Sequence, residues 1–308
     1  MQRLSELDST LVWVGCALLV FGLRVPISAG EPREPIACGE GVELRLSRWD
    51  PAQGSLLLLE VRSRRPVAAL KARWAGQTLH FWQDSDLESS YQAFLGVDLQ
   101  LEAKPHILAL ETTLEGGERL GCSAALSVQE GHFALQQLSV AQRFVDLSSK
   151  DLERARRESR RLKRIFASVT PERLWWGEFR LPLEGSEASG SFGRRRVLNG
   201  QPRSPHSGED FPAPSGTAVR ATNRGRVVLA EELFFSGNSV VLDHGFGLYS
   251  FYGHLESISV EAGRIVAAGD LLGRVGATGR VTGPHLHWAT RLNAARVNPL
   301  DLLALFSP

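Results

Sequence analysis

Short apolar runs separated by turn-forming residues make up residues 36–140. The candidate strands are the segments 54–63, 77–83, 94–103, 106–114 and 122–130. Turn signals such as DPAQG and LEGGE lie between them. Strands of this length and spacing are typical of two packed antiparallel sheets. The pattern therefore predicts a β-sandwich domain over residues 36–140.

The hydrophobic period changes at residue 147. Up to residue 166, apolar or small residues recur at steps of three and four, which marks one narrow stripe on a helix: Leu152, Ala155, Ser159, Leu162 and Phe166. Ser148 and Asp151 form an N-terminal helix signal, and Pro171 stops the helix. We therefore expect a helical linker over residues 141–185.

The predicted helix is strongly basic. Residues 150–164 carry eight basic and three acidic side chains, a net charge of +5. A solvated face on a connecting helix is the interpretation that this pattern favours. The alternative is contact with an anionic envelope polymer or lipid.

From about Ser189 the chain again has the pattern of strands, with glycine at the turns. Apolar or alternating runs span residues 216–233, 238–255, 263–279 and 285–292. No long helical period occurs in this part of the sequence. The prediction is a second domain over residues 186–308, so the fold class is mainly β: an N-terminal β-sandwich, a connecting helix and a C-terminal antiparallel β-sheet domain.

One unbroken apolar run, Leu11 to Leu23, lies near the start of the chain. Thirteen residues span about 20 Å as a helix, less than the roughly 30 Å of a hydrocarbon core. This length is typical of a signal peptide, and ISAG at 27–30 offers small residues for cleavage. We interpret residues 1–29 as a signal peptide or an uncleaved membrane anchor. The expected location is outside the cytoplasm, in the periplasm or cell envelope.

Composition adds two constraints. The 308 residues have a formal net charge of +1, which gives no support for nucleic acid as a partner. Cys16 lies inside the apolar run, so Cys38 and Cys122 remain as the pair that an exported protein can join in a disulfide. Two unrelated buried thiols are the alternative. A closed loop of this length stabilises the fold by about 4–5 kcal/mol in the chain-entropy treatment.

Five of the eight histidines follow residue 205, and four of them form a pattern with one aspartate. His206 precedes Asp210 by four residues, and both are side chains that bind zinc. His285 and His287 are two residues apart, so on a strand they point to the same side. His254 supplies a further group for proton transfer or charge stabilisation. Three protein ligands with one open position are the arrangement of a catalytic zinc ion.

These residues carry a resemblance to a known family. The segments HSGEDF, SGNSVVLDHGFGLYSFYGHL, AAGDLLGRVGATGRVTGPHLHW and VNPL resemble the lysostaphin/LytM-type zinc metalloendopeptidases from about residue 192 to residue 300. The order His-x-x-x-Asp, Tyr-x-His and His-x-His is specific to that family. The resemblance implies a compact antiparallel sheet domain with a groove over the metal, and cleavage of peptide cross-links in bacterial peptidoglycan.

The resemblance also implies roles for single residues. One Zn²⁺ per chain is expected on His206, Asp210 and His287, with His254 and His285 in the catalytic positions. His244 is expected to be structural or to line the groove. Position in the chain, rather than the resemblance, indicates contacts with the peptidoglycan stem peptides for three further residues, with packing in the strand as the alternative for the tyrosine: Asn199, Arg203 and Tyr252.

The departures from the family pattern are few. Glu209 stands where an apolar residue is usual, and Asn298 stands where aspartate is common. A sandwich ahead of the peptidase resembles envelope-located members that have an N-terminal immunoglobulin-like domain. The alternative function is a non-catalytic envelope protein that recruits or activates a separate wall hydrolase. Such members usually lack one or more zinc ligands, and all five positions are filled here.

Overall fold

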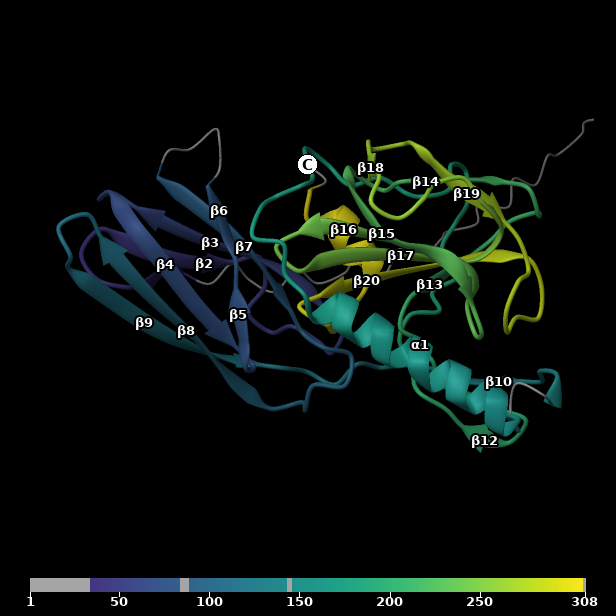
Figure 1. Cartoon of the computed structure of the whole chain (residues 1–308). Helices are drawn as coiled ribbons and strands as arrows, with labels where there is room; N and C mark the ends of the chain where they lie inside the picture. The colour runs from purple at the N-terminus through teal and green to yellow at the C-terminus, as the bar shows by residue number, and fades with distance from the viewer. Residues whose placement is uncertain (1–33, 84–88, 143–145, 307–308) are drawn as a thin grey trace, which may run out of the picture.

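The structure is a computed structural model that describes residues 34–83, 89–142 and 146–306. Figure 1 shows two β-rich modules side by side, with one long helix along the C-terminal module. The predicted mainly β fold class is confirmed. The expected signal peptide or membrane anchor over residues 1–29 lies outside the described residues. Within the described part of the chain, no helix is both long and apolar enough to span a membrane.

The N-terminal module consists of two antiparallel sheets, with strand orders β1-β2-β3-β7-β6 and β5-β4-β8-β9. The strands are β1 (Ile36–Ala37), β2 (Val42–Leu46), β3 (Leu56–Ser63), β4 (Val67–Trp74), β5 (Gln77–Leu79), β6 (Phe81–Gln83), β7 (Ser90–Gly96), β8 (Pro105–Leu114) and β9 (Arg119–Ser127). Leu59 of the first sheet and Trp74 and Leu110 of the second belong to one apolar core. The module is therefore a two-layer sandwich; its likeness to an immunoglobulin domain stays an expectation.

Strand β4 was not among the predicted strands. Its first half is exposed or half-buried although its residues are apolar, and buried and exposed positions alternate only from Lys71 to Trp74. Four residues are too few for a period of two to indicate a strand. The predicted disulfide is confirmed: Cys38 and Cys122, which are 84 positions apart in sequence, are bonded, with Cα atoms 4.7 Å apart.

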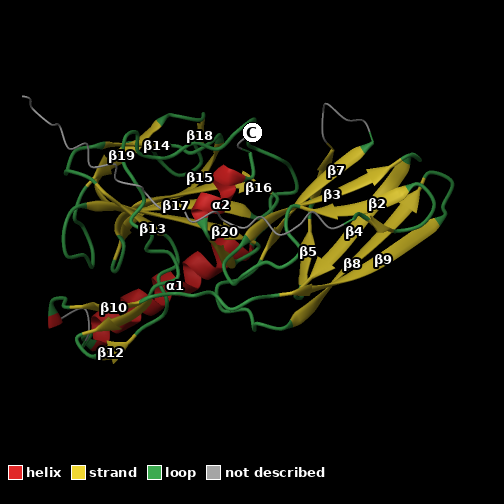
Figure 2. Ribbon diagram, turned by 180° about the vertical axis from the view of Figure 1, so that it is seen from behind, coloured by secondary structure: helices red, strands yellow, loops and turns green. Residues whose placement is uncertain are grey.

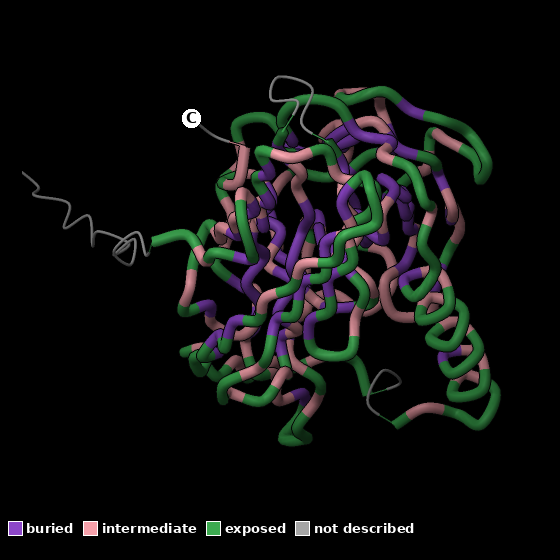
Figure 3. The backbone as a smooth tube through the Cα atoms, turned by 90° about the vertical axis from the view of Figure 1, so that its left-hand side faces the viewer, coloured by how far each residue is buried: buried purple, intermediate pink, exposed green. Residues whose placement is uncertain are grey.

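The C-terminal module is built on one antiparallel sheet with the order β13-β20-β17-β16-β15-β18. Its strands are β13 (Glu209–Pro212), β14 (Ala218–Arg220), β15 (Gly225–Leu233), β16 (Gly237–Gly245), β17 (Leu248–Ile258), β18 (Ile265–Val266), β19 (Leu271–Val275), β20 (His285–Leu292) and β21 (Ala295–Val297). The first eight residues of β17 are all buried, because this central strand is covered on both faces. Figure 3 shows the buried positions gathered in the interior of the molecule, with exposed positions toward its outside.

A small sheet joins the end of the first module to the second. Strand β10 (Leu135–Leu138) pairs in parallel with β11 (Arg195–Leu198), and β11 pairs with β12 (Gln201–Pro202). Residues 135–138 were assigned by the sequence to the sandwich, but their hydrogen bonds are made with the C-terminal module. Figure 2 shows β10 and β12 beside the long helix, below the main sheet.

Helix α1 (Ser149–Ala167) matches the predicted segment, and the Ser148 side chain accepts a hydrogen bond from Asp151 N. Phe166 is buried, and with Leu162 and Ile165 it packs on Val241 and Phe251 of the sheet. The stripe is shorter than predicted, because Leu152 and Ser159 are exposed. Most of the basic side chains are exposed, and whether they contact an envelope polymer stays a prediction.

The two modules share a core and polar contacts. Trp82 and Phe94 of the sandwich pack with Trp175 and with Val297 of the second module. Short helix α2 (Pro299–Ala304) is capped by Asn298, whose side chain accepts from Leu300 N. Asn298, which departs from the family pattern, is thus an ordinary N-cap residue. Asp301 of α2 accepts from Leu56 N at 2.9 Å.

Candidate metal centre

The sheet register places two of the predicted ligands opposite each other. Strand β13 pairs with β20, and in this register Asp210 faces His287. His206 lies in the loop just before β13 and is buried. Gly208 permits this approach, because an added Cβ would lie 2.6 Å from the Trp288 carbonyl oxygen and 2.7 Å from the His287 ring. The backbone thus gathers three residues that are up to 81 positions apart.

The three side chains present one ligand atom each to a common point. His206 Nε2 lies 2.8 Å from His287 Nδ1 and 3.2 Å from Asp210 Oδ1, and His287 Nδ1 lies 2.9 Å from Asp210 Oδ1. In tetrahedral zinc sites with bonds of about 2.0–2.1 Å, ligand atoms are about 3.3 Å apart. The donor set and its spacing therefore fit a zinc ion, and among the described residues His206, Asp210 and His287 form the cluster able to hold a metal.

Electrostatics keep these groups in their ligand forms. Burial lowers the pKa of His287 to about 4 despite its hydrogen bond to Asp210, so the imidazole is neutral at physiological pH. Burial would raise the pKa of Asp210, but its close contacts with the His206 and His287 rings outweigh that effect and hold the pKa well below its usual range. A neutral imidazole and an ionised carboxylate are the forms that bind metal.

Ser191 orients two of the ligands. Its carbonyl oxygen accepts from His206 Nδ1 at 3.0 Å, which leaves the lone pair of Nε2 free to face the site. Its hydroxyl oxygen accepts from Asp210 N at 2.9 Å. The other carboxylate oxygen of Asp210, Oδ2, accepts from Arg196 at 3.3 Å.

Glu209 in turn holds Ser191. The Glu209 side chain is buried, and its carboxylate accepts from Ser191 N at 2.7 Å, from Phe192 N at 3.1 Å and from the hydroxyl groups of Ser189 and Ser191. Sequence reasoning treated Glu209 only as a departure from the family pattern. An acidic residue next to a ligand, where the family pattern has an apolar residue, is the signal that points to such a support.

His254 and His285 lie beside the cluster, with ring centroids 4.8 Å apart. His254 Nδ1 donates to the Thr278 carbonyl oxygen and His285 Nδ1 donates to the Gly283 carbonyl oxygen, both at 2.9 Å. Because a carbonyl only accepts, each Nδ1 carries the proton and each Nε2 is the basic atom. His285 Nε2 lies 3.8 Å from Asp210 Oδ1. Burial, with the charges of His287 and His285, lowers the pKa of His254 to about 3.

A break in the strand brings His254 into the site. In a regular strand His254 would share a face with Tyr252. His254 instead has φ +63°, in the left-handed region, and this interrupts the alternation. As a result His254 lines the groove with Phe251, whereas Tyr252 points into the core.

Tyr252 does not reach the groove, so its predicted contact with substrate has no geometric support, and its position agrees with the alternative of a packing residue. Its side chain is fully buried, and its hydroxyl accepts from Thr222 N at 3.0 Å and shares a hydrogen bond with Ser250. Ser250 in turn contacts His244 Nε2 at 2.7 Å, while His244 Nδ1 donates to the Arg224 carbonyl oxygen. Tyr252 and His244 thus belong to one buried polar chain within the sheet.

The other two expected substrate residues differ in position. Arg203 lines the groove. Asn199 lies in the exposed turn between β11 and β12, where its side chain bonds the backbone of Val140. Asn199 is not among the residues of the groove wall, so its part in substrate binding stays a prediction without geometric support.

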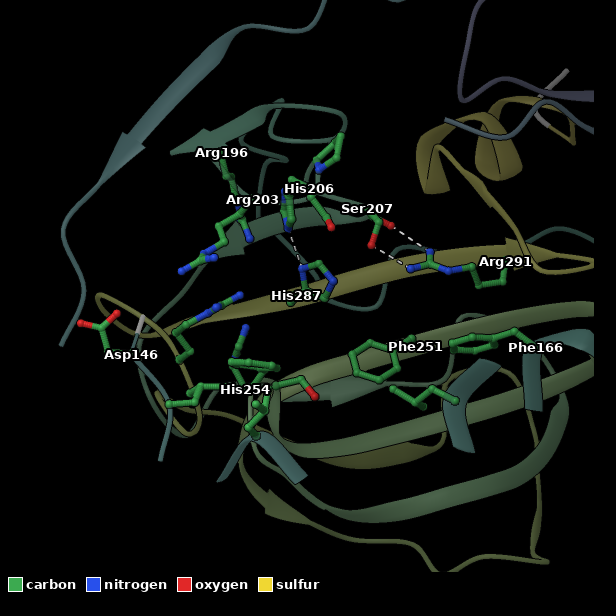
Figure 4. A pocket seen from close by; sticks show the side chains of 18 residues that line it. Asp146, Phe166, Arg196, Arg203, His206, Ser207, Phe251, His254, His287 and Arg291 are labelled. Carbon is green, nitrogen blue, oxygen red and sulfur yellow. Dashed lines mark hydrogen bonds between the residues drawn. The ribbon is translucent and has the colours of Figure 1, made fainter. Parts of the chain in front are cut away.

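The groove over the metal cluster has a volume of about 860 Å³. Helix α1 forms one wall with Leu162 and Phe166, and the sheet supplies Phe251, His254 and His287. Figure 4 shows Arg196, Arg203 and Asp146 at one end and Phe251 and Phe166 at the other, with His206 and His287 between them. The guanidinium of Arg291 donates to the Ser207 carbonyl and hydroxyl oxygens and so fixes the loop that carries His206.

Comparisons with known proteins agree with this geometry. The model of Peptidase family M23 matches residues 204–299, a span that contains every predicted ligand and both catalytic candidates. The chain contains a domain of peptidase family M23. The resemblance read from the sequence is thereby confirmed for the C-terminal module.

The similarity to curated relatives covers roughly a third of this chain. DD-carboxypeptidase/endopeptidase Mpg of Neisseria meningitidis is 41% identical over 97 residues, which are 32% of this chain and 22% of that protein. Peptidoglycan DD-endopeptidase ShyA of Vibrio cholerae is 38% identical over 123 residues, 39% of this chain and 29% of that protein. The chain thus spans less than a third of the length of these relatives.

A solved structure extends the likeness to both modules. A peptidase M23 crystal structure from Pseudomonas aeruginosa is 29% identical, with a TM-score of 0.64, and the alignment covers 83% of this chain and 96% of that one. A cover of this extent includes the sandwich as well as the M23 domain. The arrangement of a sandwich beside an M23 domain is therefore not unique to this chain.

Proposed function

We propose that the chain is a zinc-dependent endopeptidase that hydrolyses peptide cross-links of bacterial peptidoglycan in the cell envelope. The observation that carries the proposal is the complete site: His206, Asp210 and His287 converge on one point, and two further histidines with basic Nε2 atoms lie beside it. The curated relatives are named as endopeptidases of peptidoglycan, which supports the substrate class.

One Zn²⁺ per chain would be held by His206 Nε2, Asp210 Oδ1 and His287 Nδ1. When bound, zinc lowers the pKa of a water molecule from about 15.7 toward about 7 and polarises a peptide carbonyl. The protein supplies the proton transfers. With Nδ1 held by a backbone carbonyl, His254 and His285 each offer Nε2 to accept the proton of the attacking water.

The same two histidines serve the second half of the reaction. Once protonated, an imidazole Nε2–H donates to the oxygen that becomes negative, or delivers its proton to the leaving amine. The groove runs from the arginines past the ligand histidines to the two phenylalanines, so an extended peptide can lie across the site (Figure 4). His206 is buried, Asp210 and His287 are half-buried, and α1 forms a wall of the groove, so the site has limited contact with bulk water.

The test combines metal analysis with digestion of purified peptidoglycan by the full chain. We expect about one zinc per chain, release of muropeptides, and loss of zinc in His206→Ala and Asp210→Ala. His285→Ala should keep its zinc and lose at least about a hundredfold in cleavage rate. A wild-type chain that binds zinc and releases no muropeptide contradicts the proposal and favours the recruiter of a separate hydrolase.

A further inference from the structure

Three arginines from separate segments meet at one end of the groove. Arg196 belongs to β11, Arg203 follows β12, and Arg280 lies in the loop between β19 and β20. All three side chains are half-buried. Burial lowers the pKa of Arg280 to about 10, and the positive charges of Arg196 and Arg203 lower it further. The guanidinium groups are therefore close enough to repel one another.

The groove has an excess of positive charge. Among the described residues that line it, four are arginines and Asp146 is the acidic one. The carboxylate of Asp210 contacts Arg196, but its other oxygen faces the two ligand histidines and serves the metal site. Placing like charges together in a half-buried wall costs free energy, and an anion held between them offsets that cost.

The position of the arginines relative to the metal restricts the anion. Arg196 lies 3.3 Å from Asp210 Oδ2, on the ligand carboxylate itself. A substrate carboxylate bound by the three arginines would therefore lie close to the metal ligands. In the substrate, such a carboxylate is only a few covalent bonds from the peptide carbonyl that is attacked. The opposite end of the groove presents the rings of Phe166 and Phe251, which suit small apolar side chains (Figure 4).

We propose that Arg196, Arg203 and Arg280 form a carboxylate subsite that binds the amine-side residue of the scissile cross-link. This inference rests on the proposed function and specifies its substrate. In a direct cross-link to a diamino diacid, the carbon that bears the scissile nitrogen also bears a carboxylate. A glycine bridge has no ionised group next to its amide bonds. The planar guanidinium matches a carboxylate with paired hydrogen bonds, which explains the use of arginine.

The experiment compares three cross-linked stem-peptide dimers of the direct type. The first has both carboxylates free, the second is amidated beside the scissile nitrogen, and the third is amidated at the terminal carboxylate. We expect kcat/KM of the full zinc-loaded chain to fall roughly tenfold to a hundredfold for the second dimer, and less than threefold for the third. Equal rates for the first two dimers overturn the subsite.

Variants connect this preference to the arginines. In Arg203→Gln and Arg280→Gln the ratio of kcat/KM between the first and second dimers should fall toward one. Arg274→Gln, an exposed arginine of the same domain, is the matched control and should keep the wild-type ratio. A variant that slows both dimers and keeps the wild-type ratio shows a structural role and contradicts the proposal.

A binding measurement separates this inference from the proposed function. The amine-side stem peptide alone, with the carboxylate free or amidated, is titrated into the full chain by calorimetry. Tighter binding of the free form by at least about tenfold, lost in Arg203→Gln, supports the subsite even if no dimer is cleaved. Cleavage of the dimers with equal affinity for the two peptides supports the peptidase and overturns the subsite.

Discussion

The two β modules differ in what they bury. The sandwich encloses an apolar core with Trp74 at its centre. The buried acidic and histidine side chains of the described residues all lie in the M23 domain: His206, Glu209, Asp243, His244 and His254. Polar groups cost free energy when they leave water unless they are hydrogen-bonded. The contrast indicates that the sandwich is built for stability, whereas the M23 domain gives up stability to hold charged and titratable groups at its site.

Removing the central tryptophan of the sandwich is the strongest test of this contrast. Trp74→Ala deletes a fully buried ring that donates from Nε1 to the Gly96 carbonyl oxygen at 3.1 Å. We expect the free energy of unfolding, measured by denaturant titration, to fall by about 3–5 kcal/mol. Zinc affinity should stay at the wild-type value.

The matched control for that variant is Trp176→Ala, because the Trp176 side chain is 62% exposed. Its free energy of unfolding should change by less than about 0.5 kcal/mol. If Trp74→Ala lowers the free energy of zinc binding as much as the free energy of unfolding, the two modules are coupled. That result would contradict the division between a sandwich built for stability and an M23 domain built for its site.

The buried His244 makes the stability of the M23 domain depend on pH. Burial lowers its pKa to about 4, from an ordinary value near 6.5. As pH falls below 6.5 the unfolded chain takes up the proton first, so stability present above pH 6.5 is lost on the way down to pH 4. The total loss from this group is about 3 kcal/mol.

The measurement is the difference in unfolding free energy between the wild type and His244→Gln, at several pH values with a chelator present. The difference should be largest above pH 6.5 and shrink toward pH 4. His132→Gln, at an exposed position in the loop before β10, is the control for the loss of a histidine and should change the free energy of unfolding by less than about 0.5 kcal/mol. A constant difference for His244→Gln would mean that its protonation is not linked to folding.

Replacing Glu209 tests whether a buried charge of the M23 domain serves the metal site rather than the stability of the fold. Glu209→Gln keeps the shape but turns one acceptor oxygen into a donor that faces Ser191 N or Phe192 N. Because Ser191 orients His206 and Asp210, we expect zinc affinity to fall roughly tenfold to a hundredfold. The affinity is measured by competition with a chelator of known strength.

Glu261→Gln, at an exposed position, is the control and should bind zinc as the wild type does. If Glu209→Gln lowers the free energy of unfolding but leaves zinc affinity unchanged, then Glu209 supports the loop alone and does not tune the metal site.

The sequence predicted those features that depend on local pattern. The stripe from Leu152 to Phe166 and the cap at Ser148 indicated α1 to within two residues, because both signals lie within the helix itself. The histidine spacings, together with the family resemblance, indicated the ligands. The register of the sheet could not be predicted from the sequence. Asp210 and His287 pair across two strands although they are 77 positions apart, and no local period in the sequence encodes that pairing.

Two features of β17 explain why the sequence did not show which way Tyr252 points. The strand is buried on both faces, so its sequence has no alternation from which to read the groove side. The left-handed φ of His254 then reverses the expected relation between Tyr252 and His254. Of the three arginines at the end of the groove, the sequence indicated Arg203 alone. The three residues lie in separate segments of the chain, which come together only when the chain folds.

The smallest expected effect concerns the charged face of α1, which contrasts with its apolar face. Arg161 pairs with Glu231 of β15, and these side chains are 46% and 38% exposed. Arg161→Gln should lower the free energy of unfolding by about 0.2–1 kcal/mol at low salt and by less at high salt, since water and ions screen an exposed pair. Arg160→Gln, at an exposed neighbouring position, controls for the loss of charge. A loss above about 2 kcal/mol for Arg161→Gln would show that the ion pair, rather than Phe166 on the sheet, holds the helix that walls the groove.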